Sequence, residues 1–132
     1  MAGTITLTSH KSFGAIRRLV VDWVADAADA SVPSLVLPVI EGTLLALETN
    51  PGATAPTDNY DVAVTDGEGA DRLHGAGANR DTATTELTPI VFTGTSLHPP
   101  VSVDEALTLA ISGNLVNSAL GRVVIIYSPG AA

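Results

Sequence analysis

The fold class is decided by one segment near the middle of the chain, Asn59-Tyr60-Asp61-Val62-Ala63-Val64-Thr65-Asp66-Gly67-Glu68-Gly69-Ala70-Asp71-Arg72-Leu73. Its first half alternates apolar and polar side chains, which predicts a β-strand with one buried face. Asp66-Gly67 then predicts a tight hairpin turn, because glycine adopts positive φ angles without steric penalty. A short return strand is expected over residues 70–73. This strand–turn–strand unit favours an all-β protein.

Similar patterns recur outward from this segment. Further strands are predicted over residues 4–8, 15–25, 32–40, 43–49, 90–92, 103–112 and 121–127. Turn signals separate them, notably at Lys11 to Gly14, Glu41-Gly42 and Asn50-Pro51-Gly52. About eight short strands bounded in this way predict an antiparallel β-sandwich, for which a jelly roll is one arrangement. Residues 1–132 are expected to form a single domain, since no repeat or second domain is needed.

Three features of the strands are specific enough to be tested. Trp23 is the only tryptophan and is expected to anchor the core. Residues 121–127 are apolar on both faces, which predicts a central strand. Residues 103–112 are ambiguous, because Ser102 and Glu105 resemble a helix capping box. The alternation of apolar and polar residues from 107 to 112 favours a strand there over a helix.

Two segments are expected at the margins of the fold. Pro33 and Pro38 cannot donate ladder hydrogen bonds, so residues 32–40 form either an edge strand or an extended arm. Residues 1–9 are the second such segment. An arm or an open edge can add a strand to a neighbouring subunit, whereas the alternative is an ordinary edge within the monomer.

The charge of the chain excludes several partners. It carries 14 Asp and Glu against six Lys and Arg, a net charge of −8. Binding to phosphates needs clustered basic side chains, and the adjacent Arg17 and Arg18 point to opposite faces of a strand, so no nucleic-acid partner is expected. No apolar run reaches the ~20 residues that span a membrane, so no membrane association is expected. The absence of cysteine excludes disulfides.

The low density of charge has two interpretations. Charged residues make up 15% of the chain, below the usual ~25%. Either the surface is formed by Thr, Ser and Asn, or neighbouring subunits cover much of it. Both interpretations stay open at the level of the sequence.

No pattern indicates catalysis, and the chain is not expected to be an enzyme. His10, His74 and His98 are far apart and fall in predicted turns, and no Gly-x-Ser-x-Gly nucleophile elbow is present. A second group, the glycines at 67, 69, 75 and 77, is followed by a polar, β-prone stretch rather than a helix, which argues against a phosphate loop. No catalytic, cofactor-binding or metal-binding residue is therefore assigned, and no cofactor is expected.

Calcium is the one metal for which the sequence offers a plausible set of ligands. Five carboxylates fall in a short window: Asp58, Asp61, Asp66, Glu68 and Asp71. They are hard oxygen ligands, but their spacing differs from an EF-hand loop. Solvated turn carboxylates are the favoured interpretation.

A family resemblance sharpens the prediction of function. It is carried by the motifs Gly42-Thr43-Leu44-Leu45, Thr49-Asn50-Pro51-Gly52-Ala53-Thr54-Ala55-Pro56-Thr57-Asp58-Asn59-Tyr60-Asp61-Val62, Thr65-Asp66-Gly67-Glu68-Gly69-Ala70-Asp71, Gly75-Ala76-Gly77-Ala78-Asn79-Arg80-Asp81-Thr82, Leu107-Thr108-Leu109-Ala110-Ile111-Ser112-Gly113-Asn114 and Gly121-Arg122-Val123-Val124-Ile125. Over residues 42–126, these turns and strands resemble small structural proteins encoded by tailed bacteriophages and prophages.

The resemblance implies a non-enzymatic virion protein. Within that class, a capsid decoration (cement) protein that stabilises the head by bridging capsomers comes first, and a tail or head–tail component is the alternative. The implied partners are the major capsid protein and copies of the chain itself in a homo-oligomer. The implied location is the phage particle, assembled in the host cytoplasm. A receptor- or glycan-binding module and a hydrolase on a jelly-roll scaffold are the alternatives from other classes.

Overall fold

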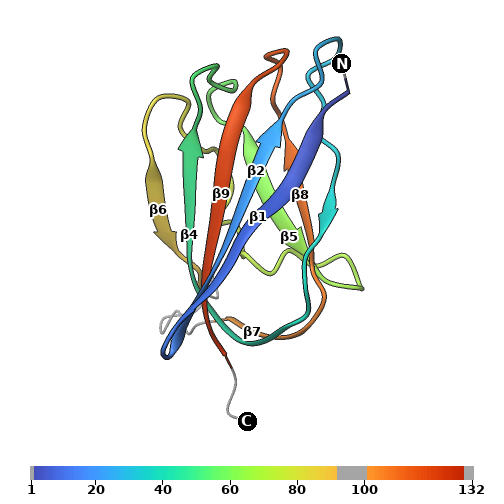
Figure 1. Ribbon diagram of the computed structural model, residues 1–132. Helices are drawn as coiled ribbons and strands as arrows, with labels where there is room; N and C mark the ends of the chain where they lie inside the picture. Colours follow the sequence, from blue (N-terminus) through green and yellow to red (C-terminus); the bar gives the residue numbers. More distant parts are fainter. Residues whose placement is uncertain (1, 92–100, 130–132) are drawn as a thin grey trace.

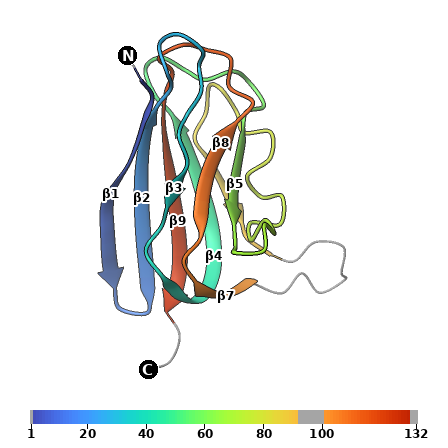
Figure 2. The same ribbon diagram turned by 90° about the vertical axis from the view of Figure 1, so that its right-hand side faces the viewer.

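The computed structural model describes residues 2–91 and 101–129 and confirms an all-β antiparallel sandwich. Its strands are β1 (Thr4–Phe13), β2 (Ile16–Val24), β3 (Leu35–Val36), β4 (Ile40–Pro51), β5 (Asp61–Thr65), β6 (Glu86–Pro89), β7 (Val101–Glu105), β8 (Thr108–Ser112) and β9 (Leu120–Pro129). Sheet A has the order β1-β2-β9-β4-β6, with β7 also paired to β4, and sheet B has the order β3-β8-β5. Figures 1 and 2 show the two layers from the front and from the side. Within the described residues, no helix is long and apolar enough to cross a membrane.

The core lies between the two sheets and is mainly aliphatic, as expected for a chain with few aromatic residues. Trp23 is 1% exposed, so its predicted place in the core is confirmed. Its ring centroid lies 5.8 Å from that of Tyr60, which comes from the segment leading into β5. This tilted aromatic pair connects sheet A to the layer of sheet B.

Strand β9 is central in sheet A, which confirms the prediction for residues 121–127. It pairs with β2 on one side and β4 on the other. Val123 and Ile125 face the core, while Val124 faces outward and is still buried beside its cross-strand neighbour Val20. Strand β9 can therefore carry apolar residues on both faces, because flanking side chains cover its outer face as well.

The turn predicted at Asp66-Gly67 is confirmed, but the return strand predicted over residues 70–73 is wrong. Strand β5 pairs with β8, more than 40 positions away in the sequence, and residues 70–73 form turns instead of a return strand. A single bridge, from Thr65 to Asp71, remains of the expected pairing. The physical reason is that the Asp66 carboxylate accepts the N–H groups of Glu68 and Ala70, which closes a tight loop.

Residues 103–112 are extended, which confirms the strand over the helix, but they form parts of two strands rather than one. Strand β7 pairs with β4 in sheet A, and β8 pairs with β3 and β5 in sheet B. The chain crosses between the layers at Leu107, which is fully buried and whose carbonyl accepts the N–H of Leu37. Burial of this side chain at the crossing explains why the apolar alternation of residues 107–112 begins at Leu107, ahead of β8.

Several predicted boundaries also need correction, and the described strands number nine. Strand β1 continues to Phe13, so the turn falls at Gly14 (φ 63°) instead of starting at Lys11. Strand β4 runs unbroken past Glu41-Gly42, because this stretch pairs with β7 and β9 at once. The strand expected at 90–92 lies at 86–89 instead, and Phe92 is outside the described residues. Of residues 32–40, Leu35–Val36 form β3 and Ile40 begins β4.

Candidate interaction surface

The sandwich has four lateral margins, formed by β1 and by β6 with β7 in sheet A, and by β3 and β5 in sheet B. A strand at a margin presents unpaired N–H and C=O groups, and these can pair with another chain. Folded proteins block such edges with prolines, charges, short strands or covering loops. The treatment of each margin therefore indicates where a partner strand can bind.

The β5 margin is covered by the glycine-rich segment that follows it. The N–H of Val62 donates to the carbonyl of Gly77 at 2.7 Å, and the N–H of Arg72 donates to that of Val64 at 2.7 Å. At the start of β5, Arg80 donates its N–H to the Tyr60 carbonyl at 2.7 Å. A Cβ atom at Gly77 would overlap the Val62 carbonyl, so only glycine allows this close approach. The glycine-rich segment from Asp66 to Arg80 thus covers the β5 edge, and we call it the edge cover.

The five carboxylates considered for calcium stabilise this cover or lie in its turns. Asp66 accepts two backbone N–H groups and an Arg72 side-chain bond of 2.7 Å, and these interactions lower the pKa of Asp66. Asp71 accepts the N–H groups of Val64, Leu73 and Gly75, Asp61 accepts that of Asn79, and Asp58 accepts that of Thr82. Glu68 is exposed beside them. Across the described residues, no group of three or more His, Cys, Asp or Glu side chains is placed to hold a metal ion.

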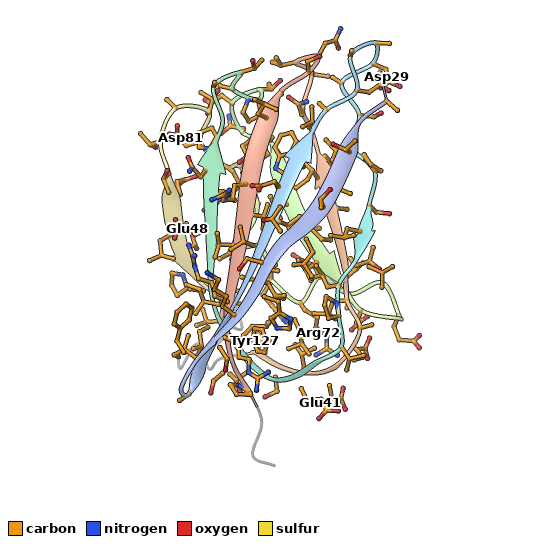
Figure 3. All side chains as sticks on the ribbon, in the orientation of Figure 1. Asp29, Glu41, Glu48, Arg72, Asp81 and Tyr127 are labelled. Carbon is orange, nitrogen blue, oxygen red and sulfur yellow. The ribbon has the colours of Figure 1, made fainter. Side chains whose placement is uncertain are left out.

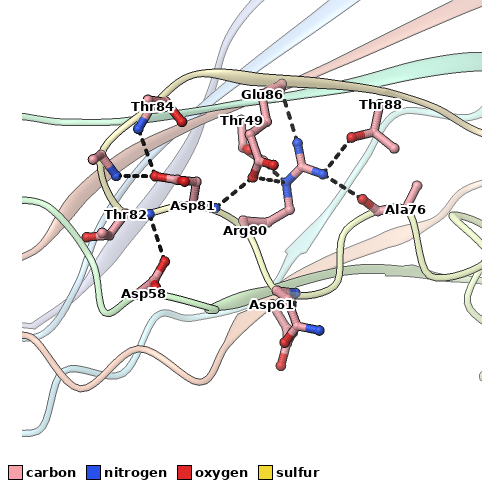
Figure 4. Close-up of polar contacts among 12 residues, drawn as sticks. Thr49, Asp58, Asp61, Ala76, Arg80, Asp81, Thr82, Thr84, Glu86 and Thr88 are labelled. Carbon is pink, nitrogen blue, oxygen red and sulfur yellow. Dashed lines mark hydrogen bonds and ion pairs between the residues drawn. The ribbon is translucent and has the colours of Figure 1, made fainter.

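A buried arginine fastens the cover to sheet A, as Figure 4 shows. Arg80 is 2% exposed, and its guanidinium donates to Thr49 Oγ1 at 2.8 Å and Thr88 Oγ1 at 2.8 Å. It also donates to the carbonyls of Ala76 at 2.7 Å and Glu86 at 3.1 Å, and the Glu86 carboxylate lies 3.6 Å from Nε. Every partner lies in the cover, β4 or β6, so the charge is satisfied internally. Sequence reasoning missed this role, because Arg80 stands in a polar stretch that has the composition of an exposed loop.

Two further margins are blocked by their own sequence. Strand β6 is four residues long and includes Glu86 and Pro89. Strand β3 is two residues long and lies between Pro33 and Pro38. Short strands, prolines and charges at an edge all discourage the addition of another strand.

Strand β1 is less protected than the β3, β5 and β6 margins, because its blocking features are limited to Lys11 and one β-bulge. It is ten residues long, contains no proline, and has one residue of fixed charge, Lys11. Its other side pairs with β2, and the register shifts once, between Leu7 and Ser9. A long edge strand of this composition is a ready template for strand addition.

The register shows which groups of β1 face away from the sheet. The backbone N–H of Ala25, the residue after β2, donates to the carbonyl of Ala119, the residue before β9. Backbone groups alternate in direction along a strand, so those of the odd-numbered residues of β2 point toward β9 and those of the even-numbered residues point toward β1. Asp22 is therefore hydrogen-bonded to Thr6. In antiparallel pairing, the backbone groups of the neighbouring residues Ile5 and Leu7 then point outward. These are the groups that a partner strand would meet.

An apolar seam lies beside this edge. Ile5 and Leu7 from β1, and Val32 and Leu35 from the β3 segment, are each half-buried against the core. Figure 1 shows the N-terminal part of β1 and the cyan strand β3 toward the same, right-hand margin of the sandwich. The two segments predicted as arms or edges thus lie at one margin. They combine an open hydrogen-bonding edge with a seam of incompletely buried apolar side chains.

The histidines lie at separate places. His10 is on β1, where its Nε2 lies 2.6 Å from the Tyr127 hydroxyl. His74 lies in the edge cover and lines a shallow hollow of about 280 Å³ with Leu73, Gly75, Ala76, Thr88, Pro89 and Val91. His98 lies outside the described residues.

A second hollow, of about 300 Å³, lies at the end of sheet A where β9 begins. It is lined by the backbone turn at Gly52 and by Asp22 and Arg122, which form a two-pronged ion pair of 2.6 and 3.1 Å. The guanidinium of Arg122 lowers the pKa of Asp22. Both charged groups are satisfied by each other, so the hollow presents no free base or nucleophile from this pair.

Comparisons with known proteins add little. No family model matches the chain, and no curated protein matches it. A chain from the solved structure described as the capsid asymmetric unit of cyanophage Pam1 is similar over 95% of this chain and 94% of that chain. The identity is 19% and the TM-score is 0.42, a likeness that assigns neither fold nor function.

Proposed function

We propose that this protein is a non-enzymatic structural component of a bacteriophage particle, and specifically a decoration protein that stabilises the head by bridging capsomers. The observation that carries the proposal is the long, weakly protected edge of β1 in a sandwich whose β3, β5 and β6 margins are covered or blocked. An unpaired edge of this kind gives a protein that acts by adhesion a surface for strand addition. The resemblance of residues 42–126 to phage structural proteins supplies the biological setting.

The attachment follows from the geometry of the β1 margin. A partner strand from the major capsid protein would pair with the outward backbone groups of Ile5 and Leu7. Its alternate side chains would complete the burial of the seam formed by Ile5, Leu7, Val32 and Leu35. Backbone pairing supplies affinity in this mode of recognition, and the side-chain contacts supply specificity.

The use of the charged side chains supports a structural role. Arg72, Arg80 and Arg122 are each paired with a carboxylate, and the Asp side chains of the turns accept backbone N–H groups. These groups stabilise the fold and are thereby occupied. A body of this kind holds its shape while one edge binds a neighbour.

The test is binding to empty heads of the phage or prophage that encodes the chain. We expect the purified protein to co-sediment with the heads and to raise their melting temperature, because a ligand of the assembled state stabilises it. Imaging of the decorated heads by cryo-electron microscopy would then show β1 against the shell. Density on the tail or neck instead would favour the tail or head–tail alternative and contradict decoration.

A matched pair of variants separates the edge from the rest of the surface. Ile5→Pro removes an outward N–H that no strand of the monomer uses, whereas Ile5→Ala removes side-chain volume and keeps the N–H. We expect both variants to fold, Ile5→Ala to weaken head binding through the lost seam contact, and Ile5→Pro to lose most of the binding. Equal binding by the two variants would exclude strand addition at β1.

A further inference from the structure

Two cations lie directly opposite each other at the free end of the β1–β2 hairpin. Lys11 of β1 is the register partner of Arg18 of β2. Residues that face each other across strands project their side chains on the same side, and like charges in this position repel. Neither cation forms an ion pair or a hydrogen bond with another described residue. On a chain with a net charge of −8, this is an unneutralised basic spot.

Two apolar side chains extend the basic spot to the hairpin turn. Phe13 is 58% exposed and pairs with Ile16, which is 36% exposed. Phe13 follows Lys11 by two positions and Ile16 precedes Arg18 by two, so all four side chains share one face. We call these four residues the hairpin patch. Leu19, Val21 and Trp23 point into the core from the alternate positions of β2, so the hairpin patch is on the outer face of sheet A.

The opposite charge arrangement occurs where β4 begins. Glu41 of β4 is the register partner of Asp104 of β7, and both are exposed. Their alternate neighbours Ile40 and Val103 face the core, so this carboxylate pair is also on the outer face. Val39, two residues before Glu41, is 61% exposed. Val39, Glu41 and Asp104 form what we call the acidic patch, and neither carboxylate has an ion-pair partner among the described residues.

Both patches lie at one end of sheet A. Strand β9 connects them, because Tyr127 is the register partner of Arg17 and Pro129 is the register partner of Gly42. Figure 3 shows Glu41 at the same end of the molecule as the β1–β2 hairpin. Each patch combines two uncompensated like charges with an exposed large apolar side chain, and the charges are of opposite sign.

We propose that the two patches bind each other between two copies of this chain. Lys11 and Arg18 of one copy would face Glu41 and Asp104 of the other, with Phe13 and Val39 buried at the contact. Because both patches share one face and one end, a two-fold axis forms the contact twice, which is the commonest symmetry of homodimers. Complementary charges then replace the repulsion that each patch carries in the isolated chain.

This inference is independent of the proposed attachment to a capsid. It uses a different surface from the outward backbone groups of β1, and self-association is measured without any capsid. Loss of head binding in the Ile5→Pro variant would not contradict self-association through the two patches. A failure of self-association would not contradict strand addition at β1.

Charge reversal tests the pairing. Lys11→Glu with Arg18→Glu makes both patches acidic, and Glu41→Lys with Asp104→Lys makes both basic. Each double variant keeps two like charges opposite each other, so repulsion within the monomer is retained. We expect sedimentation velocity from about 1 μM to about 1 mM to show a dimer for the wild-type chain and about tenfold or more weaker association for each double variant. An equimolar mixture of the two double variants is expected to restore the dimer.

The control for Glu41→Lys with Asp104→Lys carries the same change in net charge at other positions. Glu48 lies midway along the outer face of sheet A, and Glu68 lies in the turn after β5 (Figure 3 labels Glu48). Glu48→Lys with Glu68→Lys should associate like the wild-type chain, and circular dichroism verifies that every variant is folded. A wild-type monomer over the whole range, double variants that still dimerise, or a mixture that stays monomeric would each overturn the proposal.

Discussion

The indole ring of Trp23 lies against Gly121, its register partner on the central strand β9. A Cβ atom at Gly121 would stand 2.6 Å from Trp23 Nε1, closer than real Cβ contacts. The largest core side chain therefore fits only because its neighbour has none. This contact fixes the depth at which Trp23 enters the core, where it meets the Tyr60 ring.

Gly121→Ala is expected to destabilise the protein by about 1–3 kcal/mol, because the added methyl group displaces a fully packed indole. Urea unfolding followed by tryptophan fluorescence measures the change. Gly67→Ala serves as the control, since a Cβ there meets only the Glu105 side chain at 3.6 Å. Equal free energies of unfolding for the two variants would contradict the close packing of Trp23 on Gly121.

Arg80→Met is expected to cost about 2–4 kcal/mol of stability and to loosen the edge cover over β5. The substitution leaves the hydroxyls of Thr49 and Thr88 without their buried donor. Hydrogen exchange of the amide of Val62, whose N–H is bonded to the cover, should accelerate.

The exposed ion pair between Arg122 and Asp22 supplies the matched control for the Arg80→Met variant. Arg122→Met removes the partner of Asp22 on the surface, where an ion pair contributes roughly 0–1 kcal/mol. If Arg122→Met destabilised the fold as much as Arg80→Met, the guanidinium of Arg80 would not be the fastening of the cover.

Stability is expected to fall as the pH decreases from about 5 toward 2. Hydrogen bonds from the Arg72 side chain and backbone N–H groups lower the pKa of Asp66 in the folded state, and backbone N–H groups of Ala83 and Thr84 do the same for Asp81. The unfolded chain, with Asp pKa values near ~3.9, then binds more protons than the folded chain as the pH drops. The stability that these groups supply is therefore present above this range and lost below it.

Asp66→Asn tests this pH dependence. The amide oxygen still accepts the N–H groups of Glu68 and Ala70, but the side chain no longer titrates. Melting temperatures measured between pH 7 and pH 2 should fall less steeply for the variant than for the wild-type chain. Parallel curves would mean that Asp66 does not contribute to acid sensitivity.

Lys11→Glu is expected to stabilise the isolated chain by about 0.5 kcal/mol, because it places opposite charges across the strands at the Lys11–Arg18 position. Lys11→Gln removes the repulsion without adding attraction, so its stability should lie between that of the wild-type chain and that of Lys11→Glu. Thermal melting at low protein concentration, where self-association is negligible, gives the order. A variant with Glu that melts below the wild-type chain would show that the two side chains do not repel.

The amino-acid sequence by itself determined most of the extended segments and the buried face of several of them. Alternation at period 2 is a local property, so it placed Trp23 in the core and identified residues 121–127 as a strand buried on both faces. It also favoured strand over helix for residues 103–112. These features follow from which face of each strand must leave water.

Only the tertiary structure decided which strands pair and which edge stays open. Strand β5 pairs with β8 on one edge, and the segment that follows it in the sequence covers its other edge in a series of turns closed by Asp66 and Asp71. This arrangement places Gly77 against Val62 and buries Arg80 under the cover. In sheet A, the order of the strands places β1 at an edge. Pairing and edge protection depend on contacts between residues far apart in the chain, which local periodicity does not encode.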